Sequence, residues 1–167
     1  MPSFELIPDE GLRVGFDRIE ARLLRELVAE MKLLLEVDIP PTDPVLERLF
    51  PQASDDPEEA ALYRELVGSE LKAVKVEALR LVADRLGQRG PLETSIPEEE
   101  WDAWLSLLTD MRLAIGTRMQ VTEAMMEAEL DPEDPDTPAM SVLHWLGWVQ
   151  GSMLAAIQQE DEDGHFE

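Results

Sequence analysis

The sequence contains no cysteine and only two histidines, His144 and His165. The first absence excludes disulfides, thiolate metal sites and thiol redox chemistry. The second leaves little support for a histidine metal site or a catalytic triad. Neither a GxGxxG fingerprint nor a Walker lysine motif is present. We therefore expect a non-enzymatic protein without a cofactor or a metal ion.

Positive charge is scarce, and it stops before the last third of the chain. The sequence has 14 Lys and Arg against 37 Asp and Glu, a formal net charge of −23, and no Lys or Arg follows Arg118. Such a field repels nucleic-acid phosphates and anionic lipid headgroups. We therefore expect no direct binding to nucleic acid or membranes, and a neutral or basic protein partner for the C-terminal part.

Long apolar runs are also missing. No stretch approaches the roughly 18 uninterrupted apolar residues of a membrane span, and the N-terminus lacks the basic region and apolar run of a signal peptide. The sequence therefore predicts a cytoplasmic protein. Its 167 residues suit a single domain, because domains commonly have about 100 to 150 residues.

Hydrophobic spacing predicts a mainly α-helical fold, a bundle of about six helices that follows a short β-hairpin in residues 1–16. Two apolar stretches flank a polar turn that contains Pro8 and Gly11, which is typical of a hairpin. We assign 1–159 to one domain and 160–167 to an acidic flexible tail. Apolar residues recur at helical spacing near 17–39, 43–50, 57–86, 95–121, 122–130 and 138–159, and the third of these segments is expected to break near Gly68 and Ser69, which would divide it into 57–68 and 69–86.

The helix near 95–121 carries charges in an apolar setting, and we expect it to be central. Asp110 and Arg112 lie two positions apart, about 200° around a helix, so each must find a partner on another element. We favour a structural network, because unpaired buried charges cost several kcal/mol. Presentation of Arg112 or Arg118 to a ligand or a partner acid stays open. Gly116 suggests close approach by another backbone.

The last helix is apolar over more than one face. Val142, Val149 and Met153 belong to a core stripe, while other positions extend the apolar surface. Gly147 and Gly151 would make a flat strip for another helix, either within the domain or in a dimer. Trp and Met are enriched at interfaces, so we predict a partner or dimer surface of Met125, Met126, Leu143, Trp145, Gly147, Trp148 and Gly151.

Acidic residues between 131 and 136 invite a calcium site. Three prolines, Pro132, Pro135 and Pro138, interrupt this segment, and the glycine and distal glutamate of an EF-hand are missing. We therefore expect a solvated acidic loop.

Several motifs together resemble one family over nearly the whole chain. The most specific is Trp104-Leu105-x-x-Leu108-x-Asp110-x-Arg112-Leu113-Ala114-x-Gly116-Thr117-Arg118. It is followed by Trp145-Leu146-x-Trp148-Val149-Gln150 and preceded by Asp43-Pro44-Val45-Leu46-Glu47-Arg48-Leu49-Phe50-Pro51. These stretches resemble the AosR-type oxidative-stress regulators of actinomycetes. The signature residues are Asp43, Arg48, Asp55, Lys75, Asp110, Arg112, Gly116, Thr117 and Arg118.

The resemblance implies transcription regulation without DNA binding, through a protein partner that is an extracytoplasmic-function sigma factor. Sigma factors carry basic DNA-binding surfaces, which agrees with the acidic charge. The family's proposed disulfide sensing cannot operate here, because the chain has no cysteine. Oxidation of Met125 and Met126 is chemically possible. Two other functions stay open, a cytoplasmic homodimeric adaptor or scaffold and an enzyme that uses Asp110 for acid–base chemistry.

Overall fold

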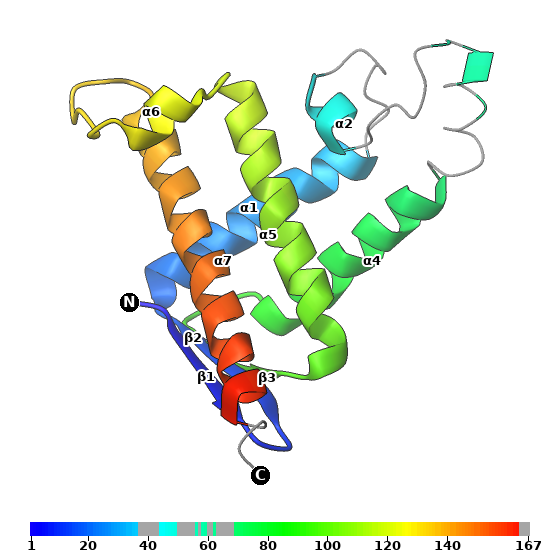
Figure 1. Cartoon of the computed structure of the whole chain (residues 1–167), viewed down its shortest axis with the longest axis vertical. Coiled ribbons are helices and arrows are strands. Elements are labelled where there is room, and N and C mark those ends of the chain that lie inside the picture. The colour runs from blue at the N-terminus through cyan, green and yellow to red at the C-terminus, as the bar shows by residue number, and fades with distance from the viewer. Residues whose placement is uncertain (37–43, 50–55, 57, 60–61, 63–68, 164–167) are drawn as a thin grey trace.

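The computed structural model describes residues 1–36, 44–49, 56, 58–59, 62 and 69–163 (Figure 1). The described chain is mainly helical and has a short antiparallel sheet, as the sequence predicts. Its elements are β1 (Ser3–Ile7), β2 (Gly11–Phe16), α1 (Arg18–Glu36), α2 (Pro44–Leu49), α4 (Ser69–Leu86), β3 (Leu92–Ile96), α5 (Glu98–Arg118), α6 (Glu123–Glu127) and α7 (Thr137–Asp163).

The sheet has three strands in the order β1-β2-β3, and both pairings are antiparallel. The predicted hairpin is confirmed, but the third strand was missed. Residues 92–94 follow a glycine–proline pair, which indicates a loop, and residues 95–96 fall at the start of the helix expected near 95–121, whereas the structure places both segments in β3. The central position of β2 explains its alternation, in which Leu12, Val14 and Phe16 are buried and Arg13 is exposed.

The helices do not form a six-helix bundle. In Figure 1, α1 crosses behind α5 and α7, and α2 and α6 are short pieces of six and five residues. Helix α5 packs against α4, α2 and α7, whereas α1 packs mainly against α4. Helix α7 covers the sheet through β1. Spacing along a single helix predicts which face is apolar, but it does not establish the angle at which two helices pack.

The core lies where the sheet, α1, α4, α5 and α7 meet. Leu12, Ile96, Leu146 and Met153 are among its completely buried side chains. The predicted core stripe of the last helix is confirmed at Val149 and Met153, whereas Val142 is only partly buried. The end of α4 is held by the Arg25 guanidinium, whose Nη2 donates to the Leu86 carbonyl oxygen at 2.7 Å.

Several predicted features fall at the limits of the described residues. Helix α7 continues to Asp163, so its backbone includes the first residues of the segment assigned to a tail. Residues 164–167, and His165 with them, lie outside the described chain. So do most residues of the predicted helix 57–68. Within 1–36, 44–49 and 69–163, no helix is both long and apolar enough to cross a membrane.

Helix α1 begins with a reciprocal cap that gives a pH-dependent prediction. Asp17 Oδ1 accepts a hydrogen bond from the Glu20 N–H at 2.8 Å, and Glu20 Oε1 accepts one from the Asp17 N–H at 2.9 Å. The hydrogen bond from the Glu20 backbone is the main cause that lowers the pKa of the Asp17 carboxyl. The ionised cap therefore stabilises the fold above the unfolded pKa, and this contribution is lost as pH falls through the lower folded value.

We expect the variant Asp17→Ser to keep a neutral cap and to lose this pH dependence. The difference in Tm between the original protein and the variant should narrow as pH is lowered from 7 through about 4 and below. Thermal unfolding followed by circular dichroism at each pH measures it. A Tm difference that stays constant down to about pH 2 would contradict the role of the ionised cap.

Candidate functional site

The charges predicted in the central helix lie on α5, and Asp110 forms an ion pair with α4. Lys75 Nζ lies 2.9 Å from both Asp110 Oδ1 and Asp110 Oδ2. The two side chains are only 13% and 9% exposed. A pair this sheltered from water fixes α4 against α5, because neither charge can separate without being left buried. Two signature residues far apart in sequence are thus brought together.

Arg112 points to the other side of α5 and meets α7. Its Nη1 donates to Gln150 Oε1 at 2.8 Å, and Gln150 Nε2 in turn donates to the Leu105 carbonyl oxygen and to Thr109 Oγ1. The guanidinium lies over Gly147, where an added Cβ would stand 3.4 Å from Nη2. The prediction that Asp110 and Arg112 find separate partners on other elements is therefore confirmed.

Two more signature residues, Gly116 and Thr117, accept backbone hydrogen bonds that end α5. The Val121 N–H donates to the Gly116 carbonyl oxygen at 2.9 Å, and the Gln120 N–H donates to the Thr117 carbonyl oxygen at 3.2 Å. With Gln120 at φ 52°, this is a Schellman ending. The predicted close approach of another backbone at Gly116 is wrong for the described chain, since an added Cβ there would meet no described atom from another element within 4 Å.

The remaining signature residues differ in what can be said of them. Arg48 is exposed in the last turn of α2, and Arg118 is exposed in the last turn of α5. Asp43 and Asp55 lie outside the described residues. The structure thus brings together Lys75 with Asp110 and Arg112 with α7, and these contacts are structural.

The predicted partner surface is not one continuous patch. Leu143 is buried in the core with 4% exposure, so its assignment to the surface is wrong. The helical repeat turns this side chain inward, one turn before Leu146. Gly147 is covered by Arg112, whereas Gly151 is exposed and would leave open space around an added Cβ. The flat glycine strip therefore accommodates a side chain at one end.

The aromatic part of that predicted surface lies over the sheet. Trp145 is partly buried against Phe16, and Trp148 is 44% exposed beside Phe4, with ring centroids 6.3 Å apart in each pair. Met125 and Met126 are half-buried in α6. Figure 1 places α6 and β1 at opposite ends of α7. The methionines and tryptophans are therefore separate features.

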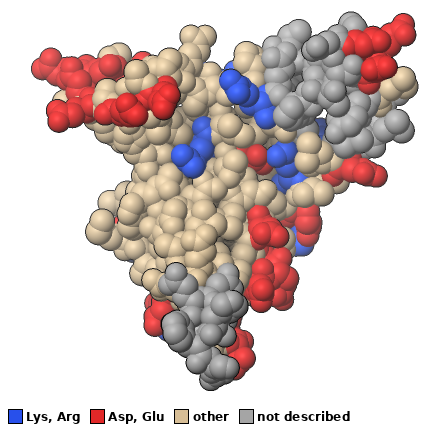
Figure 2. All heavy atoms as spheres, viewed as in Figure 1, with Lys and Arg blue, Asp and Glu red and all other residues tan. Residues whose placement is uncertain are grey.

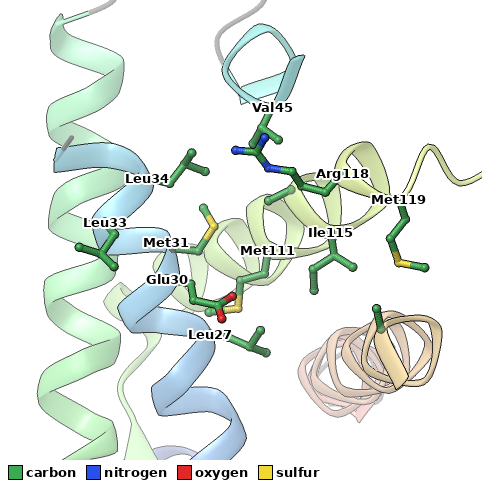
Figure 3. Close-up of a pocket in the computed structure, with 12 residues that line it drawn as sticks. Leu27, Glu30, Met31, Leu33, Leu34, Val45, Met111, Ile115, Arg118 and Met119 are labelled. Carbon is green, nitrogen blue, oxygen red and sulfur yellow. The ribbon is translucent and has the colours of Figure 1, made fainter. Parts of the chain in front are cut away.

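The structure has an apolar groove between α1 and α5 that was not predicted from the sequence. Its volume is about 530 Å³. In Figure 3, Leu27 and Met31 of α1 approach Met111 and Ile115 of α5. The apolar residues recur at helical spacing on both walls, a signal that could have indicated more apolar surface than one partner covers. The lining residues are Leu27, Glu30, Met31, Leu33, Leu34, Val45, Met111, Ala114, Ile115, Arg118, Met119 and Ala139.

One known protein family matches almost the whole chain. A family described as Domain of unknown function (DUF2017) matches residues 1–157. The chain belongs to the DUF2017 family. Its description names neither oxidative stress nor a sigma factor. No curated protein and no solved structure matches the chain.

An acidic segment lies beside one end of the groove in this DUF2017 member. It follows Met119 and precedes Ala139, which both line the groove. Figure 2 shows its carboxylates gathered over α6 and the loop that leads to α7. We name this set the α6–α7 acidic segment; its exposed members are Glu123, Glu127, Glu129, Asp131, Glu133, Asp134 and Asp136.

Two aspartates of this segment, which are exposed to solvent, form local hydrogen bonds with the backbone two residues further on. Asp131 Oδ1 accepts a hydrogen bond from the Glu133 N–H at 3.0 Å, and Asp134 Oδ1 accepts one from the Asp136 N–H at 2.9 Å. These local turns use carboxylate oxygens that a calcium ion would need. No cluster that could hold a metal ion occurs among the residues that the structure describes. The acidic segment places negative charge beside the groove.

Proposed function

We propose that this protein is a non-enzymatic regulator that acts by binding a protein partner, and that the partner is an extracytoplasmic-function sigma factor. The observation that carries the proposal is that the two buried or half-buried charges of α5 are engaged in contacts within the fold. Asp110 and Arg112 are held by α4 and α7, whereas in the described part of the chain the apolar groove and the acidic surface are open to a partner.

The Lys75–Asp110 pair also supports this proposal over a carboxylate enzyme. A general base must be within hydrogen-bonding reach of a substrate proton, but both oxygens of Asp110 are 2.9 Å from Lys75 Nζ and the side chain is 9% exposed. Substrate would have to break a buried ion pair to reach it. This geometry favours a structural role for Asp110.

The choice of a sigma factor rests on charge and on resemblance. The net charge of −23 favours association with a basic surface and speeds the encounter. Sigma factors present such surfaces to DNA, and the motif from Trp104 to Arg118 resembles that of the AosR-type regulators. Regulation would then follow from competition with DNA or from a changed fit to RNA polymerase.

The test is direct binding of the purified full chain to purified extracytoplasmic-function sigma factors of the same organism. We expect one of them to bind, and the Kd to rise as salt is raised from about 0.1 to about 1 M, because the Debye length falls from about 10 to about 3 Å. Isothermal titration calorimetry measures both. Failure of every such sigma factor to bind the folded protein would refute the proposal.

Self-association is the second candidate, favoured by the exposed Trp148 and Leu154 of α7, which are 44% and 39% exposed. A homodimeric adaptor would bury these side chains. Sedimentation equilibrium of the free protein separates the two functions, since a regulator that binds as a monomer should sediment as a monomer across the concentration range.

A further inference from the structure

The groove between α1 and α5 is apolar surface that the helices of the described chain leave open. Helix α1 packs mainly on α4, and α5 packs on α4, α2 and α7, and α1 and α5 each supply lining residues as walls of the groove. Met31 and Met111 are buried at 4% and 2% exposure, whereas Leu33 at the edge is 62% exposed. Only Glu30 and Arg118 among the twelve lining residues are charged.

We propose that this groove binds an amphipathic α-helix of the protein partner, with a basic end of that helix beside the α6–α7 acidic segment. The inference deepens the proposed function, because it names the part of the partner that is recognised and the place where it docks. It needs only that the partner offers such a helix, whichever protein carries it.

The walls of the groove fit a helix because they are helical themselves. Met111, Ala114 and Ile115 recur at intervals of three and four residues on α5, and Leu27, Met31 and Leu34 do so on α1. A helix laid between them can insert its own side chains at the same spacing. Met31, Met111 and Met119 add flexible side chains that adapt to different apolar faces.

The charge around the groove selects a basic helix. Met119 and Ala139 form the end of the groove next to the α6–α7 acidic segment, whose seven carboxylates are exposed, and no Lys or Arg follows Arg118 in the sequence. Glu30 adds an exposed carboxylate on the α1 wall. Lysine or arginine on one end of the bound helix would face this field, and an acidic helix would be repelled.

Two designed peptides test the proposal with the full chain. Each has about four helical turns and the same leucine face; one carries three lysines at one end, and the other carries three glutamates there. We expect the lysine peptide to bind at least about tenfold more tightly in fluorescence anisotropy, and its Kd to rise with salt. Equal affinity of the two peptides would overturn the charge argument.

Methionine methyl groups report where the lysine peptide binds. With ¹³C-methyl methionine, we expect the signals of Met31, Met111 and Met119 to shift, because all three line the groove. The signals of Met125 and Met126 serve as the comparison on α6. Shifts confined to Met125 and Met126 would place the peptide outside the groove and overturn the proposal.

Two variants on one helix provide a matched control. Ile115 lines the groove, whereas Leu113 of α5 is 37% exposed and does not. Ile115→Lys should weaken binding of the lysine peptide by at least about tenfold, and Leu113→Lys by no more than about threefold. Equal losses would mean that the groove is not the site.

A third variant keeps the test valid if Ile115→Lys does not fold. Changing Glu127, Glu129 and Glu133 to glutamine removes three exposed charges from the acidic segment and leaves the groove intact. We expect weaker binding and a smaller salt dependence. Unchanged affinity and salt dependence would overturn the placement of the basic end.

The two proposals can fail separately. If a sigma factor binds and Ile115→Lys binds it as tightly as the original protein does, the groove inference fails and the proposed function stands. If no sigma factor binds, but the lysine peptide shifts the groove methionines, the proposed function fails and the groove stands as the site for another basic helix.

Discussion

Replacing Asp110 with alanine is expected to lower the free energy of unfolding by about 3–5 kcal/mol, the cost typical of breaking a buried ion pair. The change removes the Asp110 carboxylate that pairs at 2.9 Å with the Lys75 ammonium group, whose side chain is 13% exposed. Urea denaturation at pH 7 measures the loss, with the slope m used to check that unfolding stays two-state.

The double replacement Lys75→Met with Asp110→Leu is the matched control. It removes both charges and keeps apolar volume between α4 and α5, so it should recover most of the stability that Asp110→Ala loses. The exposed pair of Arg80 and Glu77, with side chains 57% and 55% exposed, should tolerate Arg80→Ala with little change. A double variant as unstable as Asp110→Ala would show that the loss is not due to a stranded charge.

Replacing Gly11 with alanine is expected to cost about 2–6 kcal/mol, the sum of a backbone cost and a steric cost. Gly11 has φ 103°, and an added Cβ would stand 2.2 Å from the Ile96 carbonyl oxygen. The backbone strain of a non-glycine residue at positive φ is worth about 1–3 kcal/mol, and overpacking adds about 1–3 kcal/mol. Because the obstacle is backbone, relief requires the end of β3 to move away from the hairpin.

Gly87→Ala separates these two causes. Gly87 has φ 63°, but an added Cβ would meet no described atom within 4 Å, so only the conformational cost of about 1–2 kcal/mol remains. Thermal and urea unfolding of the two variants should therefore differ by the steric part. If Gly11→Ala is no less stable than Gly87→Ala, β3 does not approach the hairpin as closely as described.

What the sequence could predict of the fold is local. Asp17 and Glu20 mark the start of α1, Gly87 marks the end of α4, and the alternation of Leu12, Val14 and Phe16 marks a strand, because each signal is contained within a few residues. The third strand was not predicted because residues 92–96 become a strand by pairing with β2. Their own sequence pattern does not contain that information.

At the candidate site, too, local features could be predicted and contacts between distant segments could not. Spacing around α5 was enough to predict that Asp110 and Arg112 need different partners, but it could not identify Lys75 or Gln150, which lie on other helices. Leu143 was misplaced because α7 is apolar on several faces, so composition did not reveal which one turns inward. The groove was not predicted because it is formed by the relative placement of α1 and α5, which are distant in sequence.

The central position of β2 also sets when the sheet can be completed during synthesis. Val14 pairs with Thr94, so one side of the second strand stays without its neighbour until about 80 further residues have been made. Until then the exposed edge can pair with other chains, and closing so long a loop slows folding. The nascent hairpin therefore has an edge that a chaperone could protect until β3 is made.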